Sequence, residues 1–532
     1  MTAPHPSTLP PAPQSGRYGV LTPAFGGGRM LAGYIAMVFG LFMAILDIQI
    51  VSSSLAEIQA GLSATPDEIS WVQSSYLIAE VIMIPLSGYL SRLLSTRILF
   101  VLSAASFTIA SVACAFATSL EAMIVARAAQ GFLGGAMIPT VFAASFMLYP
   151  GERRVRASVI VGLVATLAPT IGPTLGGWIT DWLSWHWLFL INVVPGICIC
   201  IAVWLFADLD RPDWSLLRNI DFAGLVGMAL FLGSLEYVLE EGPRNDWLED
   251  PSIFDFTVVA VVGGLIFFWR TFTAKNPIVD LRPFTDRNFA TGTIFGFTLG
   301  VALYGLVYVL PLYLAQVRHL TAAQIGEILF VTGACQFIVA PLAGRLTQAI
   351  DARLILTLGF ALLGISTWQM THVTNEWEFH ELLWPQVWRG IGLMLCIVPI
   401  NFLALGTLPP PLLKSAAGLY NLTRNLGGAF GIAIINSLLI DARAEHWTTL
   451  SAKVTPGAPE VQAFLDRVTA RMGDMIPGDA ELAAMKRLVG LAQQQVLVMS
   501  FADTFAALTA AFFGVAAAVW LMRKPAPAPG GA

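Results

Sequence analysis

Eight ionisable side chains stand inside long apolar stretches of the sequence, where a charge is costly. Glu327 and Asp503 lie nearer to an end of their stretches. The six deeper residues are Asp47, Glu80, Arg127, Glu236, Arg389 and Arg424. A charged residue at the centre of a membrane costs about 2.5–3.5 kcal/mol on insertion scales and usually marks an ion pathway, a substrate pathway or a proton relay. The alternatives are a buried ion pair and a side chain at a helix end that extends to the interface.

Asp47 and Arg127 are predicted to lie at a similar depth in the outer third of the membrane. Asp47 comes about 17 residues into an outward-running stretch, and Arg127 about six residues into an inward-running one. We expect direct contact or a shared cavity between them. A purely structural pair is the alternative, and it too would be sensitive to mutation because removal of one partner leaves the other charge buried alone.

Glu80 lies near the middle of its apolar stretch, far from either interface. Burial disfavours the charged form of a carboxyl group, so such a group can take up and release protons in a usable range. Glu80 could therefore carry a proton, contact a cationic substrate or act as a passive hydrogen-bonded acid. Glu236 stands close to the outer end of its stretch, and our main interpretation is a side chain that extends to the interface.

Glycine and proline crowd the stretch 157–179, which must still cross a membrane. Its second half contains Gly172, Pro173, Gly176 and Gly177. Small residues let two helix backbones approach closely, and proline lets a helix bend. We interpret this stretch as a closely packed, bendable helix of a moving bundle, with ordinary helix packing as the alternative.

The apolar stretches predict an all-α membrane protein. Hydrophobic residues make up 56% of the 532 residues and charged residues only 12%, whereas soluble domains carry about 25% charge. A spanning helix needs about 20 mostly apolar residues, and fourteen such stretches are present. They are 30–53, 68–90, 97–117, 121–148, 157–179, 187–207, 221–240, 253–272, 289–311, 322–343, 354–372, 382–406, 415–440 and 497–521.

The lysines and arginines predict that both termini are cytoplasmic, because cytoplasmic loops carry an excess of these residues. In that orientation the cytoplasmic segments hold 18 of the 29 lysines and arginines, and the short outer loops hold two, Arg244 and Arg318. One long outer loop, about 441–496, holds six, but long loops obey the rule weakly.

An internal repeat divides the chain into two halves. PLSGYLSRLLSTR (Pro85–Arg97) recurs as PLAGRLTQAIDAR (Pro341–Arg353), with Pro, Leu, Gly, Leu and Arg each 256 residues apart. Weak symmetry between halves is typical of transporters. The predicted organisation is six, two and six helices. Its segments are a disordered cytoplasmic tail 1–29, a six-helix bundle 30–207, an inserted helix pair with linkers 208–288, a second six-helix bundle 289–521 and a cytoplasmic tail 522–532.

Other chemistries find no support in the sequence. The five cysteines all lie in apolar stretches without a CxxC pair, and the six histidines are scattered, so we expect no metal and no cofactor. There is no nucleophile–base pair, phosphate loop or sizeable soluble domain. We therefore expect neither an enzyme nor a nucleic-acid-binding protein.

Several motifs in order resemble the major facilitator transporters of the fourteen-helix drug:proton antiporter type, most of all the EmrB-type multidrug exporters. The resemblance covers nearly the whole chain after residue 30. The segments that carry it are LDIQIVSSSLA (Leu46–Ala56), Arg127 with Gln130 and Gly131, the GPxxGG of Gly172–Gly177, WHWLFLINVVPG (Trp185–Gly196), NPIVDL (Asn276–Leu281) and LYNLTRNLGGAFG (Leu419–Gly431).

The resemblance implies proton entry coupled to export of small amphipathic compounds across a bacterial inner membrane. It implies that Asp47 and Arg127 couple protons, and the mid-membrane position of Glu80 makes it the third candidate for proton coupling. Candidate residues of the substrate cavity are Gln49, Gln130, Glu236, Gln336, Asn421, Arg424 and Asn425. Candidate gating and packing residues are Gly88, Arg92, Arg97, Gly172, Pro173, Gly176 and Gly177. Proton-coupled uptake of a nutrient, or export of one specific metabolite or siderophore, is the alternative.

Departures from the family pattern occur at residues that control gating. Arg92 stands where the family has an acid that stabilises one gating state, and Ser95 replaces a glycine, so we expect the contacts that stabilise this state to differ.

The loop 441–496 resembles that of exporters that work with a periplasmic adaptor and an outer-membrane channel. Its amphipathic stretches suit docking, with a solvated loop as the alternative.

Overall fold

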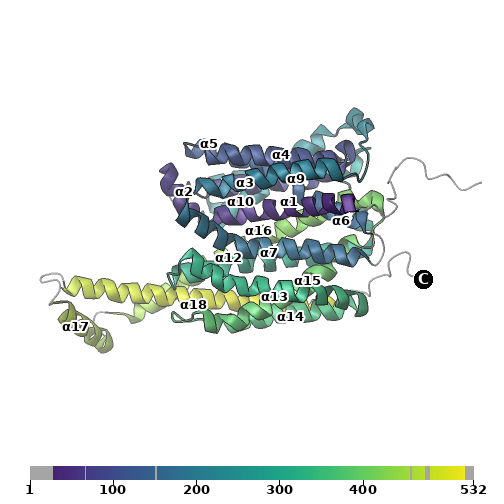
Figure 1. Cartoon of the computed structure of the whole chain (residues 1–532). Helices are drawn as coiled ribbons and strands as arrows, with labels where there is room; N and C mark the ends of the chain where they lie inside the picture. The colour runs from purple at the N-terminus through teal and green to yellow at the C-terminus, as the bar shows by residue number, and fades with distance from the viewer. Residues whose placement is uncertain (1–27, 66–67, 150–152, 456–457, 474–479, 522–532) are drawn as a thin grey trace, which may run out of the picture.

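The computed structural model describes residues 28–65, 68–149, 153–455, 458–473 and 480–521. Of the predicted tails, residues 1–27 and 522–532 lie outside the described residues, and residues 28 and 29 of the predicted tail 1–29 begin α1. Within the described ranges all regular structure is helical, and fourteen helices are long and apolar enough to cross a membrane, as predicted (Figure 1).

The fourteen spans fall into three groups along the chain. The first six are α1 (Gly28–Ser52), α3 (Trp71–Leu94), α4 (Thr96–Ala115), α5 with α6 (Leu120–Gly134 and Met137–Leu148), α7 (Arg153–Trp182) and α8 with α9 (His186–Leu190 and Val193–Phe206). The next two are α10 (Phe222–Glu241) and α11 (Pro251–Thr273). The last six are α12 (Arg287–Gln316), α13 (Ala322–Ala349), α14 (Ala352–Met370), α15 (Phe379–Leu405), α16 (Pro410–Lys453) and α18 (Ala480–Ala518). The short α2 (Leu55–Leu62) follows α1 on the outer side.

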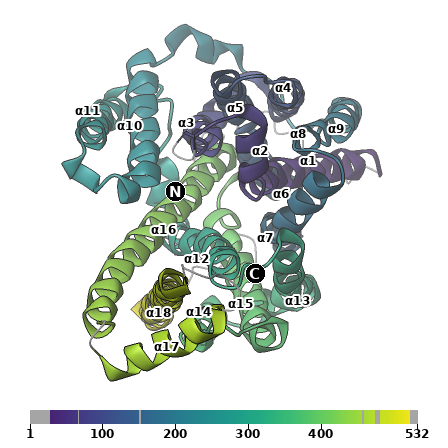
Figure 2. The same ribbon diagram turned by 90° about the vertical axis from the view of Figure 1, so that its left-hand side faces the viewer.

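The two six-helix groups form two bundles that meet along two pairs of helices. Helix α7 packs against α13 along one side, and α3 packs against α16 along the other. The inserted pair α10 and α11 lies outside the bundles, with α10 beside α3 and α16 (Figure 2). The inserted pair therefore covers one flank of the interface between the halves.

The outer surface of α11 shows what surrounds the protein. Leu265, Trp269 and Phe272 are each more than 60% exposed on this helix. Water-exposed apolar patches of this kind are rare on soluble proteins. Together with the fourteen long apolar helices, they identify a multi-pass membrane protein.

The repeat found in the sequence occupies equivalent places in the two halves. Pro85 lies inside α3 and Pro341 inside α13. Each helix ends near the same side of the bundle and is followed directly by the next one, α4 from Thr96 and α14 from Ala352.

The segment 441–496, expected as a long outer loop with amphipathic stretches, contains helices in its described part. Helix α16 continues without a break to Lys453, α17 (Pro459–Gly473) follows, and α18 begins at Ala480. These helices project from the outer side of the bundle, at the left of Figure 1. The segment is helical because its polar outer turns remain good helix formers and α17 packs on α18.

Candidate functional site

Asp47 of α1 and Arg127 of α5 form an ion pair within the first bundle. Arg127 Nη1 lies 2.7 Å from Asp47 Oδ2, and both side chains are fully buried. The similar depth predicted from the sequence therefore corresponds to direct contact. A buried pair of this kind is stable only when further hydrogen bonds satisfy the remaining polar atoms.

Three neutral side chains complete the surroundings of the ion pair. Gln130 accepts from Arg127 Nη1 at 2.6 Å and donates to Asp47 Oδ1 at 3.2 Å. Asn192 donates to the same Oδ1 at 2.6 Å, and Ser111 accepts from Gln130 at 2.8 Å. Three residues thus donate to the Asp47 carboxylate, which favours its charged form.

Two of these partners, Asn192 and Ser111, were not among the sequence candidates. Asn192 lies in the segment WHWLFLINVVPG, where a single amide in an apolar stretch was the available signal. Ser111 gave no such signal, because a serine inside a helix usually bonds to its own backbone.

Aromatic rings and a backbone carbonyl hold the Arg127 guanidinium. Its carbon Cζ lies 4.3 Å from the Tyr76 ring centroid and 5.8 Å from that of Phe189. Arg127 Nε donates to the Val72 carbonyl at 3.1 Å. The side chain is thereby fixed against α3, whose next turn carries Glu80.

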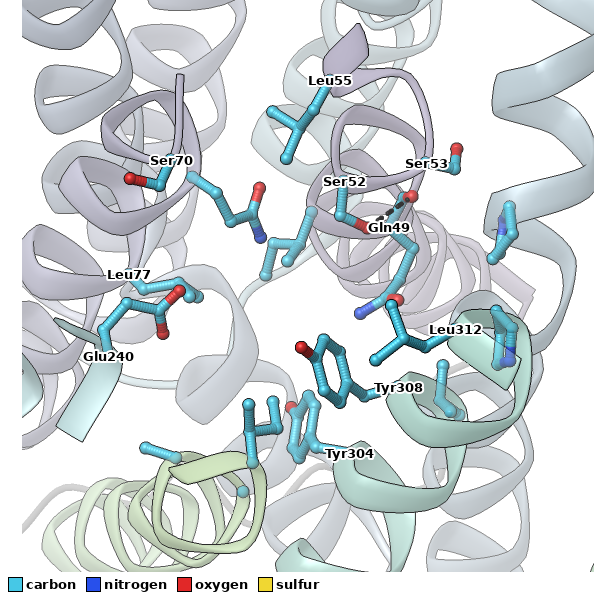
Figure 3. A pocket seen from close by; sticks show the side chains of 18 of the residues that line it. Gln49, Ser52, Ser53, Leu55, Ser70, Leu77, Glu240, Tyr304, Tyr308 and Leu312 are labelled. Atoms are coloured by element: carbon cyan, nitrogen blue, oxygen red, sulfur yellow. Dashed lines mark hydrogen bonds between the residues drawn. The ribbon is translucent and has the colours of Figure 1, made fainter. Parts of the chain in front are cut away.

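A cavity of about 480 Å³ lies between the two bundles (Figure 3). Its walls are the outer halves of α1, α3, α7, α10, α12 and α16. Three of the sequence-predicted cavity residues line it, Gln49, Glu236 and Asn425, together with Glu80 and Pro173. Glu236 is only 6% exposed, so its side chain does not extend to the interface as we had mainly interpreted it.

The other predicted cavity residues lie elsewhere in this conformation. Gln130 belongs to the ion-pair network behind the wall. Gln336 is fully buried in α13. Asn421 accepts from Arg424 Nη2 at 2.8 Å, and Arg424 stacks on Phe142. Helix rotation explains the difference, since neighbouring residues on one helix face different surroundings.

The remaining intramembrane charges do not reach the cavity either. Arg389 is 2% exposed and donates to Gln386 at 3.3 Å. Glu327 is exposed, and Asp503 in the middle of α18 pairs at 2.7 Å with His446 of α16.

The glycines of α7 permit a close approach to α1. A Cβ atom at Gly176 would stand 2.7 Å from the Ile50 carbonyl oxygen, and one at Gly172 would overlap the Gln49 side chain. Gly177 is buried one residue further on, and Pro173 faces the cavity. The crowded glycine motif therefore fixes the position of Gln49 at the cavity wall.

The cytoplasmic ends of the halves are in contact. Lys414 at the start of α16 donates to the Ser91 carbonyl at 2.9 Å and pairs with Asp210 in the linker after α9. Asp210 also accepts from the Thr96 backbone N–H at 2.9 Å. Gly88 lets α16 approach, since a Cβ atom there would stand 3.1 Å from the Lys414 carbonyl oxygen. In the orientation predicted from the lysines and arginines, the cavity lies on the outer side of this closure, which corresponds to an outward-facing conformation.

Arg92 and Arg97 lie beside this closure. Arg92 Nε donates to the Gly88 carbonyl at 3.3 Å, and Arg97 lies 3.8 Å from Asp208. Ser95 adopts a left-handed backbone with φ 83°, a conformation that favours glycine. Its hydroxyl accepts from the Ile98 N–H at 3.3 Å and so caps α4.

No group of three His, Cys, Asp or Glu side chains that could hold a metal ion is found in the part of the chain that the structure describes.

The comparisons with known proteins agree on one family. The sequence model of the Major Facilitator Superfamily matches residues 37–432. The colistin resistance protein EmrB of Acinetobacter baumannii is 44% identical over 480 residues, which cover 90% of this chain and 94% of that protein. The multidrug export protein EmrB of Haemophilus influenzae is 30% identical over 94% of this chain and 98% of its own length.

Solved structures show the same fold at low identity. A bacterial homologue of the human lysosomal transporter Spinster, inward-facing and unoccupied, has a TM-score of 0.54 at 15% identity, with 94% of this chain and 100% of that chain covered. The proton:xylose symporter XylE has a TM-score of 0.56 at 11% identity, with 92% of this chain and 95% of that chain covered.

Proposed function

The chain belongs to the Major Facilitator Superfamily of membrane transporters, and from this premise we propose that it exports amphipathic drugs in exchange for protons across a bacterial inner membrane. The observation that carries the proposal is the placement of Glu80, a buried acid on the wall of an outward-facing cavity. Glu80 lies one helical turn after Tyr76, whose ring packs on Arg127. The similarity to the multidrug export protein EmrB of Haemophilus influenzae supports the direction of transport.

Glu80 is proposed as the proton carrier. It lines the cavity, and its Oε1 has no hydrogen-bond partner in the described part of the chain. Asp47 does not line the cavity and already accepts from three side chains. Asp47 and Arg127 therefore position α1, α3 and α5, and the Arg127 charge acts on Glu80 from behind the wall.

The cycle follows from alternating access of two bundles around a midplane site. In the outward-facing form, protonation of Glu80 removes one negative charge from the cavity wall and so favours release of the substrate. Closure of the outer side then exposes protonated Glu80 to the cytoplasm. Loss of the proton there restores the carboxylate for the next substrate. An inward proton supplies about 2.3 kcal/mol per 100 mV of membrane potential, and about 1.4 kcal/mol per unit of pH difference.

Transport direction tests the proposal. A fluorescent amphipathic dye should accumulate in energised inverted vesicles that contain the protein and should be excluded from energised right-side-out vesicles. Net accumulation in right-side-out vesicles would instead establish uptake and contradict export.

The cytoplasmic contact of Lys414 predicts a conformational effect. Lys414→Ala removes the ammonium group that joins the halves in the outward-facing form, so the inward-facing population should rise. A cysteine introduced at Ser52 on the cavity wall, in a background without native cysteines, should then react about five- to tenfold more slowly with a membrane-impermeant maleimide. This factor corresponds to about 1–1.4 kcal/mol.

Asp208→Asn is the matched control for Lys414→Ala, because Asp208 makes only an exposed pair with Arg97 at 3.8 Å. Exposed pairs contribute about 0–1 kcal/mol, so its labelling rate should stay within twofold. An unchanged rate in Lys414→Ala would show that this contact does not bias the conformation.

The projecting helices are proposed to dock a periplasmic adaptor, which would continue to an outer-membrane channel. Leu482 and Val489 of α18, two turns apart, are 56% and 38% exposed on the outer projection. A photocrosslinking residue at Val489 should capture a protein with one spanning helix and a periplasmic domain. The same residue at Gln462, exposed on the polar side of α17, serves as control. Equal or absent capture at the two positions would refute this docking surface.

A further inference from the structure

We propose that Glu236 and Glu240 of the inserted helix α10 form a binding site for the positive group of an organic cation. The inserted pair would then select the charge of the substrate, in addition to filling the flank of the molecule. This inference rests on the proposed export function and assigns a substrate class to the same cavity.

Helix α10 is fixed against both halves at the cavity. Tyr237 stacks on Trp71 of α3 with ring centroids 5.5 Å apart. On the other side, Trp247 in the turn between α10 and α11 donates to Ser437 of α16 at 3.2 Å. Glu236 and Glu240 lie one helical turn apart and both line the cavity. Figure 3 shows the Glu240 side chain at the cavity wall, across from Tyr304 and Tyr308.

The cavity wall offers acceptors that lack donors. Glu236 Oε2, Glu80 Oε1 and Gln73 Oε1 are buried without a hydrogen-bond partner among the described residues, and all three side chains line the cavity. Glu236 is 6% exposed and Glu80 is 2% exposed. Buried polar atoms are normally paired, and an ionised carboxylate can only accept. A ligand with N–H groups or a positive charge would satisfy them.

The charge balance of the wall points to the same ligand. Its ionisable acids are Glu80, Glu236 and Glu240, against a single basic side chain, Arg244. The charges of Glu80 and Glu240 both interact with Glu236. Like charges four residues apart destabilise a helix, so the pair on α10 has a cost that a bound cation would offset.

Neither of the two glutamates has an ion-pair partner within 4.0 Å in the described part of the chain. The neighbouring Glu241 accepts from Ser70 at 3.3 Å and does not line the cavity. Glu240 accepts a hydrogen bond from Ser74, and among the described residues Arg244 is the positive charge that acts on it.

The rest of the wall suits an amphipathic cation. Tyr304 and Tyr308 present aromatic rings, which attract cations positioned over their faces. Apolar side chains such as Leu77, Val307 and Leu312 supply the remaining surface. The cavity volume of about 480 Å³ falls in the range of drug-sized sites, about 300–1,000 Å³.

Paired probes of different charge test the inference. Ethidium, a permanent cation, and N-phenyl-1-naphthylamine, a neutral dye, are titrated onto the purified full-length protein and then assayed for transport. In the double variant Glu236→Gln/Glu240→Gln, the ratio of ethidium to neutral-dye affinity should fall at least tenfold. Glu236→Asp/Glu240→Asp, which keeps both charges, should retain most of the ratio. Glu249→Gln, exposed outside the cavity, should keep the wild-type ratio.

The outcomes separate this inference from the proposed function. An unchanged affinity ratio in the Gln double variant, with a thermal unfolding midpoint near that of wild type, would overturn the cation site. If the Gln double variant fails to fold, the Asp double variant tests the site. Loss of the ethidium preference in Glu236→Asp/Glu240→Asp would also overturn the cation site. Binding needs no proton gradient, so the expected ratio change without energised export of either dye would support the site and refute the exporter.

Discussion

Arg127→Ala should lower dye export at least a hundredfold while the protein still inserts in the membrane. The substitution leaves Asp47 buried without its cation and removes the guanidinium that packs on Tyr76 next to Glu80. Removal of one partner of a buried ion pair typically costs about 3–5 kcal/mol. Efflux rates in cells, normalised to the amount of protein in the membrane, measure the effect.

A neutral pair distinguishes charge from packing at this position. Asp47→Asn/Arg127→Gln leaves no uncompensated charge, so thermal unfolding should recover towards wild type while export stays low. The matched control is Asp208→Asn, which breaks an ion pair with Arg97 in which the aspartate is 64% and the arginine 34% exposed. Exposed pairs contribute about 0–1 kcal/mol, so export should stay within twofold. Normal export in Arg127→Ala would refute the positioning role of the pair.

Glu80→Gln should abolish the coupling of export to protons. The amide keeps the size of the side chain but cannot exchange a proton, so a pH gradient should no longer drive accumulation of dye. Downhill exchange of substrate between the two sides should persist. Proteoliposomes with and without an imposed pH gradient measure both, and the gradient-driven component should fall at least fiftyfold.

Glu57→Gln provides the control for Glu80→Gln. Glu57 is exposed on α2, outside the cavity, so both components should stay within twofold of wild type. Gradient-driven accumulation by Glu80→Gln would assign the proton to another group.

The sequence predicted the fold and one side-chain contact because both follow from the bilayer. The length of an apolar stretch sets the number of spans, and all fourteen were confirmed. Depth along the spans placed Asp47 beside Arg127. The sequence repeat that contains Pro85 and Pro341 identified two halves. These prolines lie inside α3 and α13, which occupy equivalent places in the two halves.

Helix rotation and tilt could not be predicted, because packing against neighbouring helices sets them. Arg424 and Gln336 were therefore assigned to a cavity that they do not line in this conformation, and Glu236 was mainly assigned to the interface although it lines that cavity. Asn192 was missed for the same reason. Lys414 and Asp210 gave no signal at all, since each stands in a polar segment and their contact joins residues 204 positions apart.

Proton movement on addition of substrate tests the central claim most directly. Proteoliposomes that hold a pH-sensitive dye inside, and no initial gradient, receive ethidium on the outer surface only. Antiport predicts that ethidium entering the proteoliposomes drives protons outward, so the interior becomes more alkaline, and that the internal pH does not change with Glu80→Gln. Ethidium movement through the wild-type protein without any change of internal pH would contradict proton-coupled export.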